Sequence, residues 1–176
     1  MLLFENKIPG NKAAFIEKVK LICSYLGINP NWLMAVMESE SGLNSRAINP
    51  LTNATGYIQF MPSTARDLGT TVEALYNMAP LDQLNYVYKY LLPYKGQMKS
   101  YIDVYNAVFF PAAIGKPDNY ILKTKDISAS TIARQNSIFD LNKDAIITLG
   151  ELKQAFLERV PVSMRGMIEG VKSNFP

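Results

Sequence analysis

Apolar residues recur at helical spacing through most of this chain. Over residues 12–26 they fall on one face of an amphipathic helix, at positions such as Phe15, Val19 and Ile22. Gly27 follows, and glycine is the residue favoured just past a helix end. The pattern therefore predicts a helix that ends at residue 26.

A second helix is predicted to begin directly afterwards. Asn29 is a suitable N-cap, and Pro30 fits the first helical turn. Leu33, Val36, Met37 and Glu40 share one face of this helix. Glu40 thus continues an apolar stripe, which is an unusual place for a carboxylate.

The rest of the chain alternates between helical segments and loops. Between residues 44 and 62 the pattern is lost, and Asn, Gly and Pro predict an irregular loop or short hairpin lining a cleft. Helical spacing returns in five later stretches and breaks at Pro111. The stretches are 63–68, 81–92, 102–108 and, as two short amphipathic segments, 128–139 and 149–160. The fold class is mainly α, with little or no sheet.

Composition describes an ordinary globular protein. Apolar residues make up 48% and charged residues 19% of the 176 residues, enough for one core with a small appendage. We expect a core over residues 1–127 and an appendage over 128–176. The net charge of +3 is dispersed, so we expect no nucleic-acid partner. No segment reaches the ~20 apolar residues of a membrane helix, and the N-terminal run is too short for a signal peptide.

The chain contains no histidine. This excludes a Ser/His/Asp triad, a Cys/His pair and a histidine-ligated zinc site, which serve most amidases and peptidases. The single cysteine, Cys23, has no partner for an internal disulfide and lies on an apolar helical face. We interpret it as a buried structural thiol.

Glu40 has the properties of a general acid. A carboxylate in the last turn of a helix faces the negative end of the helix dipole, and an apolar surrounding adds desolvation. Both effects raise the pKa, and a carboxyl protonated near neutral pH can donate a proton to a glycosidic oxygen. Glu38 competes for this role, because helical periodicity favours Glu40 only modestly. An exposed glutamate at a frayed helix end is the structural alternative.

Three segments, in order, resemble the signature motifs of the soluble lytic transglycosylase family, which has a lysozyme-like fold of goose type. They are Glu40-Ser41-Gly42-Leu43, the stretch 56–65 (GYIQFMPSTA) followed by Leu68-Gly69, and Val104-Tyr105-Asn106-Ala107. The similarity covers roughly residues 29–122. Residues 105–120 resemble the version found in phage-encoded members.

The resemblance implies roles for individual residues. Glu40 is expected to be the single catalytic acid and then base, with Ser41 assisting the reacting sugar. Substrate-binding residues would be Tyr57, Ile58, Gln59, Tyr105 and Asn106, the two tyrosines offering rings for sugar stacking. Ile58 and Val108 depart from the methionine and glycine that are usual in the family.

The implied reaction cleaves the β-1,4 bond between N-acetylmuramic acid and N-acetylglucosamine in peptidoglycan. The N-acetyl carbonyl can act as internal nucleophile, and the 6-hydroxyl then closes a 1,6-anhydro ring. Hydrolysis, as in goose-type lysozymes, stays open at this stage. A carboxylate such as Asp67, Glu73, Asp82 or Asp103 could hold the water for it.

A second motif occupies residues 140–151. Side-chain oxygens at loop positions 1, 3, 5, 9 and 12 match an EF-hand calcium loop, although Ala145 replaces the usual glycine. The expected ligands are Asp140, Asn142, Asp144, Ile146, Thr148 and Glu151. We expect no cofactor for catalysis and a structural Ca²⁺ in this loop. The structural alternative is a solvated acidic turn.

Two other function classes remain open from the sequence. The chain could be a catalytically silent wall-binding or virion module, or a calcium-dependent interaction protein. Our prediction is a monomeric enzyme that acts on peptidoglycan strands without inserting into membranes. We expect it to be a phage virion-associated protein or an endolysin.

Overall fold

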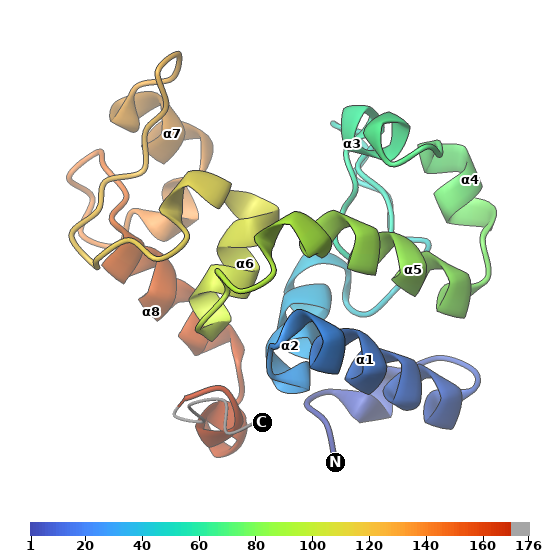
Figure 1. Cartoon of the computed structure of the whole chain (residues 1–176). Coiled ribbons are helices and arrows are strands. Elements are labelled where there is room, and N and C mark those ends of the chain that lie inside the picture. The colour runs from blue at the N-terminus through green and yellow to red at the C-terminus, as the bar shows by residue number, and fades with distance from the viewer. Residues whose placement is uncertain (170–176) are drawn as a thin grey trace.

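The computed structural model describes residues 1–169, and these form a helical fold without a sheet (Figure 1). In this part of the chain the only β-type pairing consists of the isolated bridges Ile48 to Thr55, Thr55 to Phe60 and Ile121 to Thr148. The α-helices are α1 (Lys12–Leu26), α2 (Pro30–Ser41), α3 (Pro62–Asp67), α4 (Val72–Asn77), α5 (Pro80–Leu91), α6 (Tyr101–Phe109), α7 (Ala129–Gln135) and α8 (Leu149–Arg159). Short 3-10 turns are η1 (Glu5–Lys7), η2 (Leu92–Tyr94), η3 (Pro111–Ala113), η4 (Ser137–Phe139) and η5 (Val162–Met167). The mainly α fold class is confirmed.

The first two helices begin and end where the sequence predicts. Gly27 adopts a left-handed φ of 72° after α1, which glycine accepts without strain. The Asn29 side chain accepts a hydrogen bond from the Asn31 amide, and Pro30 opens α2. The short helix α4 was not predicted from the sequence.

Helix α2 is the structural centre of the fold. Six consecutive residues, Trp32 to Met37, are buried, so α2 is covered on every side through most of its length. It packs against α1 and α6. The Trp32 indole donates to the carbonyl of Ile168 at 3.2 Å, which ties the C-terminal segment to the start of α2.

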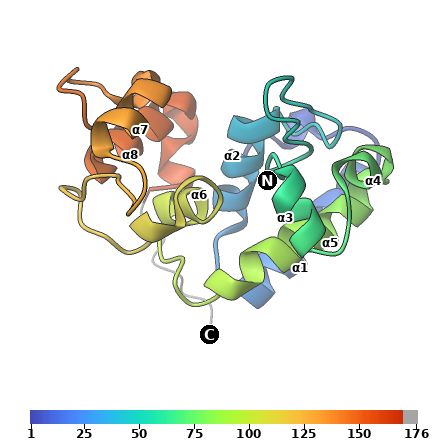
Figure 2. The ribbon, with the colours of Figure 1, turned by 90° about the horizontal axis from the view of Figure 1, so that it is seen from above.

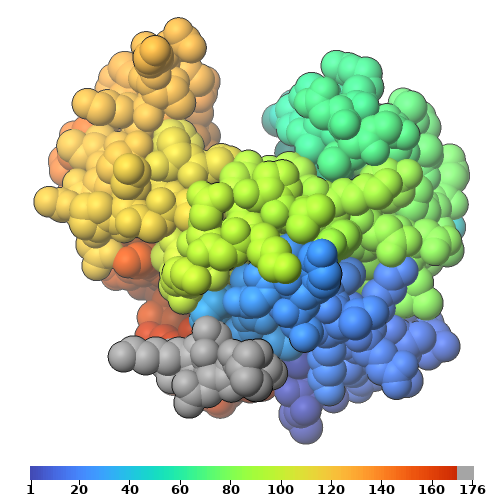
Figure 3. All heavy atoms as spheres, viewed as in Figure 1, coloured from blue at the N-terminus to red at the C-terminus, as the bar shows by residue number. Residues whose placement is uncertain are grey.

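The molecule has two lobes joined through α6 (Figures 1 and 2). One lobe contains α1, α3, α4 and α5, and the other contains α7 and α8. The space-filling view shows a hollow between the α3 region and the residues after α6 (Figure 3). Segments far apart in the sequence therefore form its opposite walls.

The C-terminal region packs on α6 through aromatic rings. Phe156 of α8 lies against Tyr105 with ring centroids 3.5 Å apart, and Phe139 contacts both Phe109 and Phe156. The amide of Leu122 donates to the carbonyl of Ile147, so part of the expected 1–127 core pairs with the EF-hand-like loop. The division at residue 127 stays a prediction, and the tail from 170 to 176 lies outside the described residues.

Candidate active site

Glu40 occupies the last turn of α2, which ends at Gly42 with a left-handed φ of 64°. The Tyr105 hydroxyl of α6 donates to Oε1 of Glu40 at 2.7 Å. Burial raises the pKa of Glu40, and the hydrogen bond from Tyr105 and the positive charge of Arg159 oppose part of that rise. The structure thus gives Glu40 the desolvated environment that a general acid requires.

Glu38, the competing candidate, has a different environment. Its carboxylate forms an ion pair with Lys7 on the other side of α2. This ion pair joins α2 to the N-terminal turn η1, which is a structural role. The two glutamates are separated by two residues, and the helix directs them to different partners.

Tyr105 connects Glu40 to the aromatic cluster of the C-terminal region. Its ring is 3% exposed and packs against Phe156 and Phe109. Burial and the nearby charge of Glu40 raise the pKa of Tyr105 well above its usual range, so the hydroxyl keeps its proton and acts as a donor. Tyr105 therefore faces Glu40 as the motif implies, while its buried ring offers no face for sugar stacking.

The motif loop is fixed by hydrogen bonds to the end of α2 and to Gln83 of α5. The Ser41 hydroxyl lies 2.9 Å from the carbonyl of Met37 and 3.1 Å from that of Tyr57, and it can donate its single proton to either. The Tyr57 amide donates to Oε1 of Gln83 at 2.8 Å. Ser41 therefore joins α2 to the motif loop.

Tyr57 and Ile58 differ from the expectation of exposed, substrate-contacting side chains. Tyr57 is 0% exposed and packs edge-to-face on Phe15, and Ile58 is 2% exposed. The prediction of a stacking surface at Tyr57 is wrong, because the ring faces the core. Burial raises the pKa of Tyr57 to about 12. Motif position indicated proximity to the cleft and could not indicate which way the side chain turns.

Gln59 and Ile58 line a small cavity of about 90 Å³ beside Tyr90 and Val108. Gln59 has a left-handed φ of 52°, and its amide donates to the carbonyls of Ala47 and Gly56. Burial raises the pKa of Tyr90 to about 12, with smaller contributions from Tyr94 and Glu40. Because the charge of Glu40 contributes to the raised pKa of Tyr90, the cavity that Tyr90 lines is electrostatically coupled to the Glu40 carboxyl.

Asn106 lies on α6 next to Tyr105 and is fully buried. Neither its amide nitrogen nor its amide oxygen has a hydrogen-bond partner among the described residues. Buried polar atoms are nearly always paired, by protein or by water. With no exposed surface, the side chain does not reach substrate in this structure, and its unpaired amide fits a buried water molecule instead.

Two residues of this region were not predicted from the sequence. Gln83 of α5 is fully buried, accepts from the Tyr57 amide and donates to the carbonyls of Ser45 and Leu75. A Cβ on Gly56 would lie 2.4 Å from Oε1 of Gln83, so only glycine fits there. Arg159 of α8 donates to Oγ of Ser39 at 2.8 Å. Neither contact joins residues near in sequence, and no motif marks them.

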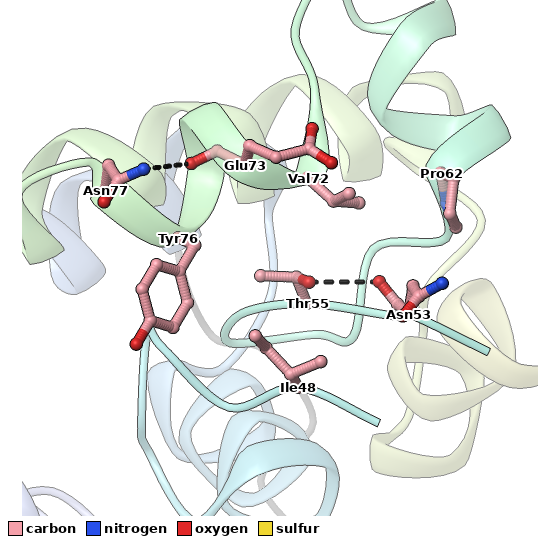
Figure 4. A pocket seen from close by; sticks show the side chains of 8 residues that line it. All are labelled: Ile48, Asn53, Thr55, Pro62, Val72, Glu73, Tyr76 and Asn77. Carbon is pink, nitrogen blue, oxygen red and sulfur yellow. Dashed lines mark hydrogen bonds between the residues drawn. The ribbon is translucent and has the colours of Figure 1, made fainter. Parts of the chain in front are cut away.

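A larger cavity of about 460 Å³ lies away from these residues (Figure 4). The loop residues Ile48, Asn53 and Thr55 form one side, and Glu73 and Tyr76 of α4 form the other. Its hydrogen bonds, from Thr55 to the Asn53 carbonyl and from Asn77 to the Glu73 carbonyl, are local. Pro62 is the one motif residue in its lining, and neither Glu40 nor Tyr105 lines it, so its size does not make it the candidate active site.

The loop 140–151 folds tightly around its own acidic side chains. Asp140 accepts from the amides of Asp144 and Ala145, and Asp144 accepts from that of Ile146. Ala145 takes the left-handed φ of 65° that glycine normally supplies in such loops. Glu151 and Thr148 form a capping box at the start of α8. Among residues 1–169 no group of three His, Cys, Asp or Glu side chains lies close enough to hold a metal ion.

Residues 23–109 match the family model of the transglycosylase SLT domain, about half of the chain. The chain belongs to this family. It is a lytic transglycosylase family with a lysozyme-like fold whose substrate is peptidoglycan. The matched SLT domain contains Glu40, the motif loop and Tyr105, whereas Arg159 and the EF-hand-like loop lie beyond it. Solved structures offer no significant match to the chain, and within residues 1–169 no helix is long and apolar enough to span a bilayer.

Proposed function

We propose that this protein is a peptidoglycan lytic transglycosylase in which Glu40 acts first as general acid and then as general base. The observation that carries the proposal is the carboxyl of Glu40, desolvated at the end of the central helix and held by the Tyr105 hydroxyl. Its position in an SLT domain supplies the substrate class.

In the first step the carboxyl of Glu40 donates its proton to the oxygen that links N-acetylmuramic acid to N-acetylglucosamine. The bond from this oxygen to C1 of the muramic acid breaks, and the N-acetyl carbonyl of the same sugar supports the electron-poor carbon. Glu40 becomes a carboxylate, stabilised by the hydrogen bond from Tyr105. The departing glucosamine carries the proton on its 4-hydroxyl.

In the second step the carboxylate of Glu40 accepts the proton of the muramic acid 6-hydroxyl. The 6-oxygen attacks C1, and the 1,6-anhydro ring closes with no water consumed. A single carboxyl suffices for both steps, since each proton that leaves Glu40 is returned to it.

The hydrogen bonds of Asp103 support ring closure over hydrolysis. Asp103, one of the candidates for holding a water, is buried and accepts from the Ser100 hydroxyl and from the amides of Lys99 and Gly115. Inverting hydrolysis needs a second carboxylate on the far side of the sugar, and Asp103 is committed elsewhere.

We also propose that the 140–151 loop binds a structural Ca²⁺. Support comes from oxygen-bearing side chains at EF-hand spacing and from the left-handed conformation at Ala145. Asp140, Asn142, Asp144 and Glu151 would supply side-chain oxygens, and Ile146 its carbonyl. The hydrogen bonds that the loop amides make to Asp140 and Asp144 are compatible with a loop wrapped around a cation. The phage-type origin, the monomeric state and the site of action stay predictions.

The proposed function is tested by the rate at which purified peptidoglycan is solubilised by wild type, Glu40→Gln and Glu38→Gln. We expect Glu40→Gln to lose about 10²-fold to 10⁴-fold, the usual contribution of a positioned acid. Glu38→Gln is the matched control, with the same chemical change two residues away, and should retain most activity. Equal rates for wild type and Glu40→Gln would refute the role of Glu40.

A further inference from the structure

Arg159 brings the C-terminal region to the catalytic helix. It lies in the last turn of α8, and its guanidinium donates to Oγ of Ser39 at 2.8 Å across 120 residues of sequence. Ser39 is the residue before Glu40 on α2. A cation from outside the SLT match is thus fixed beside the proposed acid.

Two aromatic rings hold the guanidinium of Arg159 in place. It lies over the rings of Phe156 and Phe139, at 4.9 and 5.2 Å from their centroids. Phe156 in turn packs on Tyr105, whose hydroxyl holds Glu40. Cation–π contacts orient an arginine without neutralising it, so its full charge acts on its surroundings.

The charge of Arg159 has no acidic partner within the described part of the chain. The ion pairs there join Lys7 to Glu38, Lys12 to Glu5 and Lys153 to Asp118. Arg159 is also exposed to solvent, so the cation can be reached from outside the protein. An oriented arginine beside an acid and free of other carboxylates is positioned to serve that acid.

The groups around Glu40 come from four helices. Arg159 of α8 is the cation whose charge acts on it, and Tyr105 of α6 is the hydrogen-bond donor. Burial raises the pKa of three tyrosines, and the charge of Glu40 adds to that rise: Tyr90 of α5, and Tyr101 and Tyr105 of α6. On α2 itself the nearby charge of Glu38 is paired with Lys7. Among these groups Arg159 supplies the positive charge.

We propose that Arg159 is a positioning residue of the active site, one that stabilises the carboxylate form of Glu40 and is supplied by the region after the SLT domain. This inference rests on the proposed role of Glu40. After proton donation Glu40 is an anion in a desolvated site, and the guanidinium charge stabilises it until the 6-hydroxyl returns a proton. The SLT domain alone therefore lacks one charge of its own active site.

The proposal is tested on the full chain with Arg159→Gln, Arg159→Lys and the control Arg134→Gln. Arg134 is an exposed arginine of α7, so its replacement makes the same charge change elsewhere. The titration of the Glu40 carboxyl is followed by ¹³C NMR of glutamate-labelled protein, with Glu40→Gln assigning the signal. Circular dichroism confirms that each variant is folded.

We expect Arg159→Gln to move the Glu40 titration to higher pH, because the charge that lowers its pKa is removed. Arg159→Lys, which keeps a cation, and Arg134→Gln should titrate close to wild type. The alkaline limb of kcat/KM should move the same way in Arg159→Gln, with a plateau lower by roughly tenfold, a small part of what a positioned acid contributes.

An unchanged or lower titration midpoint in folded Arg159→Gln would overturn the proposal. A shift of the same size in Arg134→Gln would also overturn it, because the effect would then be one of net charge. If every protein including wild type were inactive on peptidoglycan, the proposed function would fail, and the NMR titration would still decide the role of Arg159.

Discussion

The SLT domain is organised around a buried helix, whereas residues 110–169 are organised around a polar loop. In the SLT domain six consecutive residues of α2 are buried, and the loop that carries the second motif is tied to α2 by Ser41 and to α5 by Gln83. In the C-terminal region the loop 140–151 is closed by its own Asp and Glu side chains. The SLT domain holds the Glu40 carboxyl by packing. The C-terminal region carries the loop proposed to bind Ca²⁺ and the charge of Arg159.

This difference shows how the two regions divide the work on Glu40. The SLT domain desolvates the carboxyl and supplies Tyr105, which suits Glu40 to the proposed role of proton donor. The C-terminal region supplies the positive charge of Arg159, which favours the carboxylate left after donation. A carboxyl that must give up and then regain a proton needs both influences.

The largest effect is expected from breaking the joint between the two regions. Phe156→Ala removes a fully buried ring that packs on Tyr105 and Phe139 and supports Arg159. We expect a loss of about 3–5 kcal/mol in the free energy of unfolding, as for other buried Phe→Ala changes. Urea unfolding measures it, with the exposed Ile138→Ala as control. A loss below about 1 kcal/mol would show that the regions are not held together by this ring.

The next effect concerns the hydrogen bond that the SLT domain makes to Glu40. Tyr105→Phe keeps the ring and removes only the hydroxyl, so the carboxylate form of Glu40 loses a donor. We expect kcat/KM to fall by about tenfold, since hydrogen bonds to charged groups contribute about 1.5–3 kcal/mol. Because this bond lowers the pKa of Glu40, its loss should move the alkaline limb to higher pH.

Tyr86→Phe is the matched control, since the Tyr86 ring lies over Lys89 on α5. A Tyr105→Phe enzyme with the wild-type rate and pH profile would show that the hydroxyl does not act on Glu40.

A smaller effect is expected when calcium is added to the C-terminal loop. Ca²⁺ at about ten times its Kd would stabilise the fold by about 1.4 kcal/mol, a rise in Tm of roughly 3–6 °C for a chain of this size. Glu151→Gln should abolish this rise while keeping the capping box of α8, because glutamine serves at that position. Differential scanning calorimetry with calcium or chelator, with Asp126→Asn as control, makes the comparison. Identical melting curves in calcium and chelator would remove the metal from the account.

The smallest expected effect is on thermal stability, and it comes from the cost of ionising Glu40 in the folded protein. Burial raises the pKa of Glu40 above its value in the unfolded chain, so ionisation costs the folded state. This cost is absent at a pH below the unfolded pKa and is fully present at a pH above the folded one. Glu40→Gln, which cannot ionise, should therefore gain Tm relative to wild type as the pH rises from about 4 to neutrality. A gain of roughly 1–3 °C is expected by thermal melting, and a difference that shrinks with pH would mean that the carboxylate is stabilised by folding.

The sequence predicts those features that depend on neighbours along the chain. The ends of α1 and α2 follow from Gly27, Asn29 and Pro30, and the environment of Glu40 follows from helical spacing and the motif. Tyr57 was placed correctly in the motif loop and wrongly at the surface, because the direction of a side chain depends on what the loop packs against.

Long-range contacts of polar side chains could not be predicted. Gln83 meets the motif loop 26 residues away, and Arg159 meets Ser39 across 120 residues. Neither a glutamine nor an arginine has a sequence pattern that identifies the residue it will contact. An arginine such as Arg159 is most often a solvated surface charge. The contact of Arg159 with α2 could therefore be found only once the two regions were placed side by side.

The central claim is that Glu40 drives a ring-closing cleavage of peptidoglycan. Mass spectrometry of the muropeptides released by wild type and Glu40→Gln tests it most directly. The account predicts 1,6-anhydro products, one water lighter than reducing-end products, from wild type and almost none from Glu40→Gln. Reducing-end products from wild type would contradict the ring closure, and anhydro products released equally by Glu40→Gln would contradict the role of Glu40.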